Sequence, residues 1–145
     1  MTDRDEREMA LDRAVRALAR SDHSSASLLA RLERAGFSEH ARESALAELV
    51  RAGYVDDERY ARSRATHLAT RGYGDEWIRG DLRAHGVSTE VVEQALGELE
   101  PEAARAREQA ARLGQPARAA RMLQRRGFSA GSLESIFARI VADDP

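Results

Sequence analysis

Arginine is the residue type in this chain with the greatest capacity for chemistry. The 145 residues include 23 basic ones, and every one of them is an arginine. A guanidinium group binds phosphate or carboxylate through two parallel hydrogen bonds, which a lysine ammonium cannot do. A GC-rich genome, in which arginine codons replace lysine codons, is the simpler explanation of the bias. The chemistry that remains available in either case is anion binding.

The C-terminal part of the chain contains the first candidate anion-binding cluster. Arg118, Arg121 and Arg125 recur at i, i+3 and i+7, a spacing that places them on one helix face, and Arg126 follows them. Residues 101–139 carry eight arginines and three glutamates, a net charge of +5, whereas the whole chain has a net charge of −2. Phosphate groups or an acidic protein groove are therefore the predicted partners of this face.

A second cluster lies in the middle of the chain, with two aromatic residues, Tyr73 and Trp77, nearby. Its members are Arg59, Arg62, Arg64, Arg71, Arg79 and Arg83. Aspartate and glutamate residues are interleaved with these arginines. The middle cluster is therefore predicted either to bind a partner or to form a solvated, salt-bridged surface, and both interpretations stay open.

Catalytic and metal chemistry are not predicted. The four histidines lack the i, i+4 spacing of a ligand pair, and the chain has no cysteine. Ser21, Asp22 and His23 are adjacent, so they cannot face one another as a catalytic triad requires. The glycine-rich stretch 71–75 lacks the pattern of a phosphate-binding loop. We expect no catalytic residue, no metal site and no cofactor.

The elements that must position these arginines are encoded by an internal repeat. The segments Arg31–Ser38, Asp81–Ser88 and Met122–Ser129 share one frame, in which a leucine precedes a glycine by four residues and an apolar residue and a serine follow it. The leucines are Leu32, Leu82 and Leu123, and an aliphatic residue stands thirteen places after each glycine, at Leu49, Leu99 and Ile140.

Each copy of the repeat predicts a helix, a tight turn and a second helix. The glycine suits a left-handed helix C-terminus, and the apolar residue after it can contact the leucine of the preceding turn. The serine is a good N-cap for the next helix. The turn glycines predicted in this way, with two more at similar helix ends, are Gly36, Gly53, Gly72, Gly86 and Gly127.

A further helix precedes each pair, over about 5–20, 57–71 and 102–113, which gives nine helices and no strand. We therefore predict an all-α chain of three tandem three-helix, helix-turn-helix-like repeats that form an elongated curved array. The expected division is a charged N-terminal extension at 1–8, repeats at 9–54, 55–100 and 101–142, and an acidic tail at 143–145.

The sequence also predicts a cytoplasmic protein. It contains no stretch of about 18 apolar residues, so no membrane contact is expected. The first eight residues are highly charged and contain no apolar segment of the kind that a secretory signal peptide needs.

The chain resembles the RecX family of bacterial recombination regulators over roughly residues 9–141. The most specific matching segments are Gly53–Ala61, which reads Gly-Tyr-Val-Asp-Asp-Glu-Arg-Tyr-Ala, and Arg71–Gly74, which reads Arg-Gly-Tyr-Gly. Segments 20–24 and 125–129 match as well. Two residues depart from the family pattern: Asp75 stands where a proline is common, and Ser27 where an acidic residue is common. Both suit the first turn of a helix.

The resemblance implies a non-enzymatic regulator that binds the RecA filament on single-stranded DNA and inhibits its recombinase and ATPase activities, in DNA repair and the SOS response. It implies RecA, single-stranded DNA and, weakly, duplex DNA as partners of a monomer. The arginines of both clusters, with Tyr73, would then contact phosphates or acidic recombinase residues. The alternatives are a stand-alone DNA-binding protein that uses its helix-turn-helix modules and a repeat scaffold that binds peptides.

Overall fold

The computed structural model describes the backbone of residues 1–143 and the side chains of residues 1–138. Ile140, as a side chain, and residues 144–145 of the expected acidic tail lie outside the described residues. The described part contains nine helices and no strand. The helices are α1 (Asp3–Arg20), α2 (Ser25–Arg34), α3 (Glu39–Arg51), α4 (Asp57–Thr70), α5 (Asp75–Ala84), α6 (Thr89–Gly97), α7 (Glu102–Leu113), α8 (Pro116–Arg125) and α9 (Ala130–Asp143).

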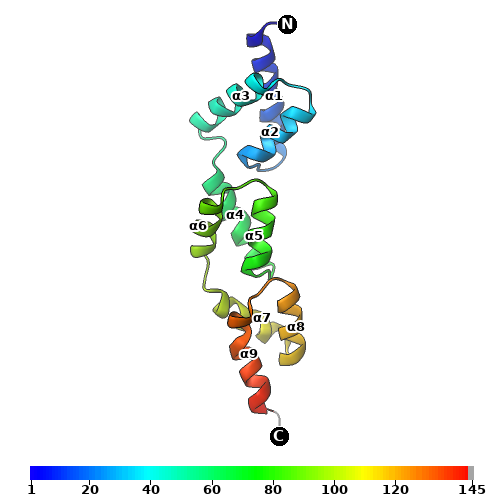
Figure 1. Ribbon diagram of the computed structural model, residues 1–145, viewed down its shortest axis with the longest axis vertical. Coiled ribbons are helices and arrows are strands. Elements are labelled where there is room, and N and C mark those ends of the chain that lie inside the picture. The colour runs from blue at the N-terminus through cyan, green and yellow to red at the C-terminus, as the bar shows by residue number, and fades with distance from the viewer. Residues whose placement is uncertain (144–145) are drawn as a thin grey trace.

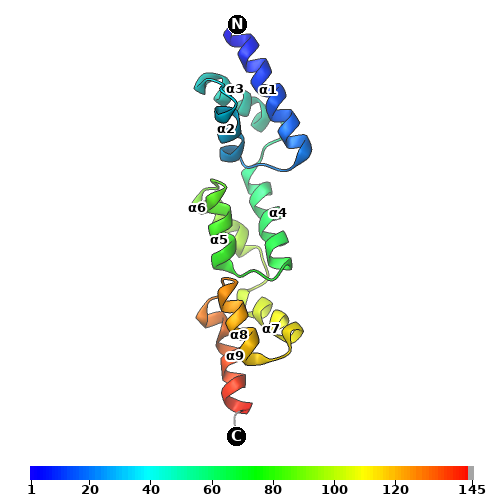
Figure 2. The ribbon, with the colours of Figure 1, turned by 90° about the vertical axis from the view of Figure 1, so that its right-hand side faces the viewer.

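The helices form three groups of three, which we call module 1 (α1–α3), module 2 (α4–α6) and module 3 (α7–α9). All of the extensive helix–helix contacts fall within a module. The modules follow one another along an elongated column, with α1 at one end of that column and α9 at the other (Figures 1 and 2). The prediction of an all-α, elongated array of three-helix repeats is therefore confirmed.

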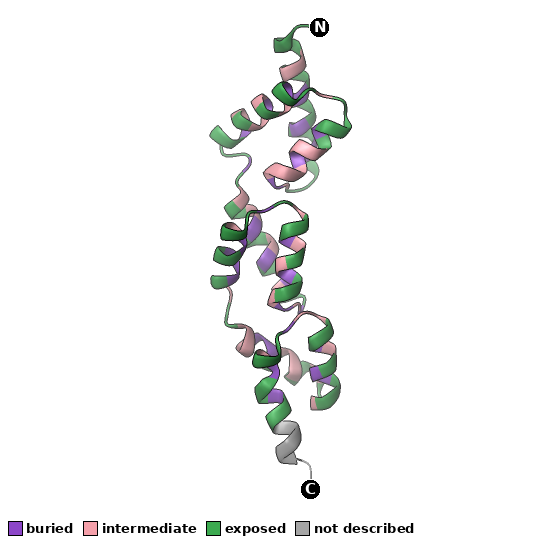
Figure 3. Cartoon of the chain, in the orientation of Figure 1, coloured by how far each residue is buried: buried purple, intermediate pink, exposed green. Residues whose placement is uncertain are grey.

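Each module has its own small aliphatic core. Buried residues line the inner faces of the helices, and the outer faces are exposed (Figure 3). Each fully buried leucine or isoleucine side chain contributes about 1.5–3 kcal/mol relative to an exposed one. The largest fully buried aliphatic side chains are Leu28 and Leu32 in module 1, Ile78 and Leu82 in module 2, and Leu123 and Leu133 in module 3.

The predicted glycine turns are present. At the end of α5, the N–H of Val87 donates to the Leu82 carbonyl at 3.1 Å and the N–H of Gly86 to the Arg83 carbonyl at 2.9 Å. This pair of bonds is a Schellman ending. The φ angles of the five predicted turn glycines are +93° (Gly36), +82° (Gly53), +92° (Gly72), +77° (Gly86) and +90° (Gly127). The serine after each repeat glycine caps the following helix through its hydroxyl: Ser38, Ser88 and Ser129.

Two boundaries differ from the sequence-based expectation. Helix α1 begins at Asp3, so most of the expected N-terminal extension is helical, because Thr2 and Asp5 form a reciprocal capping box. Val55, expected at the start of the second repeat, packs in the core of module 1. The turn after α3 brings its N–H to the Leu49 carbonyl at 3.4 Å.

The same type of hydrogen bond, from a backbone N–H to a carboxylate, joins each pair of successive modules. Between modules 1 and 2, the N–H of Ser25 donates to the Asp57 carboxylate at 2.7 Å. Between modules 2 and 3, the N–H of Asp75 donates to the Glu102 carboxylate at 2.6 Å. In both cases the first residue of a middle helix binds the first residue of the next module's first helix. A carboxylate is stabilised at this position because the helix N-terminus carries partial positive charge.

The glycine turn of the following module completes each junction. At the second junction, the carbonyl of Gly127 accepts the N–H of Glu76 at 3.1 Å, and a Cβ added to Gly127 would lie 2.5 Å from the Trp77 backbone nitrogen. At the first junction, the Ser24 hydroxyl donates to the His85 carbonyl at 2.5 Å, beside Gly86. These glycines therefore allow close backbone approach in addition to the turn itself.

Candidate anion-binding surfaces

Helix α8 presents the first candidate surface. The helix starts with Pro116, whose fixed φ suits the first helical position. Ala120 and Leu123 face the core of module 3, and they and Ala119 are fully buried. The opposite side of the helix carries the exposed side chains that we call the α8 arginine face: Arg118, Arg121 and Arg125.

The α8 arginine face has no partner within the described part of the chain. None of its three guanidinium groups forms a hydrogen bond or ion pair there. Arg126 differs, because it is half-buried and its carbonyl accepts the N–H of Gly74 at 2.8 Å. Arg126 therefore belongs to the junction between modules 2 and 3, whereas the three other arginines are open to an external anion.

The middle cluster is largely engaged within module 2. Arg64 donates two hydrogen bonds to Asp81, at 2.9 and 2.8 Å. These bonds, more than the opposing effect of burial, hold the pKa of the Asp81 carboxyl below its ordinary value. Arg79 binds Glu93 at 2.7 and 3.2 Å, and the same bonds lower the pKa of the Glu93 carboxyl.

Of the remaining arginines of the middle cluster, two have partners within the described residues and two form no ion pair there. Arg62 pairs with Glu98 at 3.0 Å, and Arg59 donates to the carbonyl of Gly53 at 3.1 Å. Arg71 and Arg83 are exposed and form no ion pair with the described residues. The salt-bridged interpretation of the middle cluster therefore agrees better with its geometry than an open binding surface does.

Tyr73 is half-buried and stacks on Trp77, with ring centroids 4.8 Å apart and the planes at 19°. Its carbonyl accepts a hydrogen bond from Arg105 at 3.3 Å. Both contacts place Tyr73 at the second junction, where it supports the fold.

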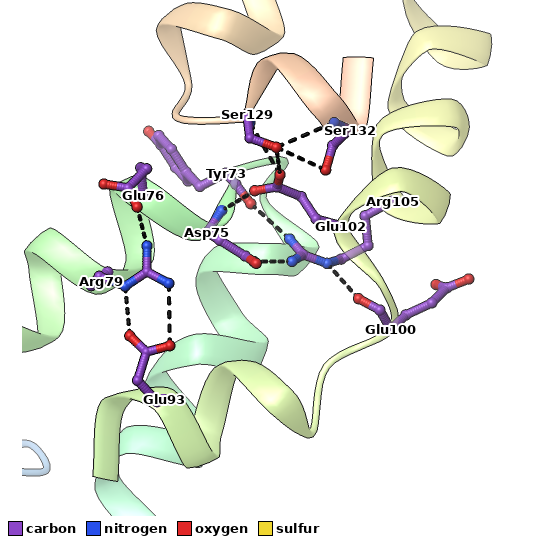
Figure 4. Close-up of polar contacts among 10 residues, drawn as sticks. All are labelled: Tyr73, Asp75, Glu76, Arg79, Glu93, Glu100, Glu102, Arg105, Ser129 and Ser132. Carbon is purple, nitrogen blue, oxygen red and sulfur yellow. Dashed lines mark hydrogen bonds and ion pairs between the residues drawn. The ribbon is translucent and has the colours of Figure 1, made fainter. Parts of the chain in front are cut away.

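A buried arginine that the sequence did not reveal completes this junction. Arg105 is 7% exposed and donates to the Glu100 carbonyl at 2.8 Å, to Tyr73 and to the Asp75 carboxylate. Figure 4 shows Arg105 of α7 reaching the turn before α5, the start of α5 and the segment before α7. Asp75 is thus the partner of a buried charge.

Glu102 is the acceptor at the centre of the same network. Besides the N–H of Asp75, it accepts the N–H and hydroxyl of Ser129 at 3.0 and 2.8 Å (Figure 4). Burial alone raises the pKa of this carboxyl. The bonds from neighbouring serine hydroxyls and from the two backbone N–H groups outweigh that effect, so the pKa of Glu102 is lowered.

Module 1 carries a second arginine surface that the sequence analysis missed. Arg13, Arg16 and Arg20 of α1 and Arg31 of α2 line a hollow of about 280 Å³, which we call the module 1 arginine hollow. The i, i+3, i+7 spacing of the first three is the same as on α8 and could have revealed them. The signal was hidden because residues 1–100 carry 15 arginines against 20 acidic residues.

Within the described residues, no group of three or more potential metal ligands lies together. His23 lies between the hydroxyls of Ser21 and Ser27, at 3.3 and 3.0 Å, and burial, assisted by the charge of Arg31, lowers the pKa of its imidazole. Among the described helices, none is long and apolar enough to cross a bilayer.

Comparison with known proteins identifies the family. The regulatory protein RecX of Thermus thermophilus is 44% identical over 123 residues, which cover 84% of this chain and 85% of the relative. The regulatory protein RecX of Halorhodospira halophila is 32% identical over 143 residues, covering 92% and 89%. The chain belongs to the RecX family. The family model for the second three-helix domain of RecX matches residues 56–96 of this RecX-family chain, from the N-cap of α4 to the last turn of α6.

The fold agrees with that assignment. The crystal structure of RecX from Lactobacillus salivarius superposes with a TM-score of 0.81, covering 95% of this chain and 98% of the other at 16% identity. The resemblance predicted from the sequence motifs is confirmed, and the chain is a regulatory protein of the RecX family.

Proposed function

We propose that this regulatory protein binds the RecA filament on single-stranded DNA and inhibits its recombinase and ATPase activities, in DNA repair and the SOS response. The observation that carries the proposal is the α8 arginine face, which is exposed and has no partner among the described residues of a chain from a regulatory family. Guanidinium groups bind phosphates and acidic side chains through charge-assisted hydrogen bonds. The protein acts as a monomer in the cytoplasm without catalysis or a cofactor.

The elongated column suits a helical filament as its partner. A rod of three modules can contact several successive recombinase subunits, whereas a compact domain of the same length would contact fewer (Figures 1 and 2). Lodged along the filament groove, the rod blocks the incoming DNA strand and restrains the subunit movements that accompany ATP hydrolysis. The α8 arginine face holds module 3 against phosphates or acidic recombinase residues.

The test replaces Arg118, Arg121 and Arg125 together with alanine. Exposed substitutions cost little folding energy, typically within about 0.5 kcal/mol each. Each lost contact weakens binding by about 0.5–1 kcal/mol after screening by water and salt. The concentration needed for half-maximal inhibition of ATP hydrolysis by recombinase-coated single-stranded DNA should therefore rise about tenfold or more.

A charge-matched control variant changes three exposed arginines that belong neither to the α8 arginine face nor to the module 1 arginine hollow. They are Arg4, Arg34 and Arg51, and their change to alanine should leave inhibition like that of the parent. If the α8 variant also inhibits like the parent at two salt concentrations, the α8 arginine face is solvated surface only. The rival function, stand-alone DNA binding, predicts affinity for naked DNA that falls steeply with salt and equals the affinity for the filament.

A further inference from the structure

We propose that the module 1 arginine hollow is a phosphate-binding site that holds the backbone of single-stranded nucleic acid. Its geometry is fixed by two helices. Arg13, Arg16 and Arg20 lie on one face of α1, because residues three and four apart in a helix are neighbours. Arg31 reaches the same hollow from α2. The floor is Ala17, whose side chain is 3% exposed and too small to fill the space.

The hollow carries positive charge that the protein itself does not neutralise. Arg16 pairs with Asp12 at 3.1 Å, but their side chains are 73% and 62% exposed, so this ion pair is weak. Arg13, Arg20 and Arg31 form no ion pair with the described residues. Four neighbouring guanidinium groups repel one another, and a bound anion relieves that repulsion.

The lining of the hollow favours phosphate over an acidic protein. Its only apolar member is Ala17, and no aromatic or large aliphatic side chain takes part. Protein partners are typically held by buried aromatic or aliphatic anchors, which this hollow lacks. A nucleic-acid backbone needs no such anchor, because its affinity comes from phosphate neutralisation and counterion release.

The hollow also complements the α8 arginine face. The two surfaces lie in the first and last modules, at opposite ends of the column (Figure 1). The inference rests on the proposed function, since it adds a second contact for the same single-stranded DNA. Its test uses naked DNA, so it does not depend on whether the protein inhibits a recombinase.

The experiment changes Arg13, Arg20 and Arg31 together to glutamine and measures binding of a fluorescent single-stranded oligonucleotide by anisotropy across a salt series. The affinity should fall at least tenfold. The slope of log K against log salt should become shallower by about 2, since each phosphate contact on a single strand contributes about 0.7. The control, with Arg4, Arg34 and Arg51 changed to glutamine, should keep the parent slope. Circular dichroism checks that each variant is folded.

Each outcome decides the proposal. Parent-like affinity and slope in the hollow variant would overturn it, and so would a parent protein that binds no oligonucleotide. A labelled polyglutamate tests whether the hollow prefers phosphate. If its affinity falls in the hollow variant as much as the affinity for DNA does, the hollow is a general anion-binding surface and the assignment to phosphate is contradicted. If the hollow variant loses DNA affinity while the parent fails to inhibit recombinase, the proposed function fails and the site stands. If the parent inhibits and the hollow variant binds DNA normally, the site fails and the function stands.

Discussion

Glu102 and Arg105 show how single residues hold neighbouring modules together. The Glu102 carboxylate accepts hydrogen bonds from α5 and from the cap of α9, and Arg105 places a buried charge against Asp75. Bonds to ionised groups are stronger than neutral ones, and a buried partner left alone is costly. The second junction therefore depends on a few ionised side chains.

Replacing Glu102 with glutamine should make stability less dependent on pH. The folded-state pKa of this carboxyl is lowered from its ordinary value of 4.5. Its contribution is therefore fully present above pH 4.5 and is lost as the pH falls through the lowered value. The variant should be less stable than the parent by about 1–3 kcal/mol at pH 7, and this difference should shrink in acid. Urea unfolding of the parent and the variant, at pH 7 and at a pH below 4.5, measures the difference in the free energy of unfolding. A difference that is the same at the two pH values would contradict the prediction.

Sequence reasoning reached some of these side chains and missed others for a physical reason. The helical period of α8 is a local property, so the exposure of Arg118, Arg121 and Arg125 could be predicted. The burial of Arg105 could not, because its partners Tyr73 and Asp75 lie 32 and 30 residues away along the chain. The module 1 arginine hollow was missed because acidic residues outnumber arginines in residues 1–100, and because Arg31 joins the three α1 arginines only through the packing of α2 on α1.

The helices and turns were the most predictable elements, because their caps lie within a few residues of each helix end. The repeat glycines and serines fixed where most helices stop and start. Their second role was not visible in the sequence. Gly127 has an α-carbon that another module approaches, whereas a Cβ on Gly36, with nearly the same φ, would meet nothing within 4 Å. Only the packing of module 2 on module 3 distinguishes the two turns.

This difference gives a matched pair of substitutions. Gly36→Ala should cost about 1–2 kcal/mol, the strain of a left-handed backbone carrying a Cβ. Gly127→Ala should cost about 1–3 kcal/mol more, because its Cβ would also displace the Trp77 backbone. Urea unfolding followed by circular dichroism compares the two free energies, and Trp77 fluorescence should change only in Gly127→Ala. Equal losses of unfolding free energy in the two variants would contradict the prediction, because they would mean that the junction accommodates the added Cβ without losing stability.

At the scale of the whole molecule, the chain is a row of separate cores joined by narrow contacts. Extensive helix contacts stay within modules, and the junctions consist of a few hydrogen bonds around a glycine turn. Helix α8 begins with Pro116, which has no N–H, so module 3 lacks the donor that modules 1 and 2 use at their junctions. In such arrays stability is approximately the sum of each repeat's own stability and its nearest-neighbour interfaces.

A core substitution in one module should therefore act mainly on that module. Leu123 is fully buried in module 3, so Leu123→Ala should cost about 2–5 kcal/mol of local stability. Amide hydrogen exchange should show protection lost across α7–α9, a smaller loss at the second junction, and α1–α3 unchanged. The mirror variant Leu32→Ala should reverse the pattern, because Leu32 is equally buried in module 1. Uniform loss of protection over all nine helices of the described chain would instead mean that the junctions couple the modules into one cooperative unit.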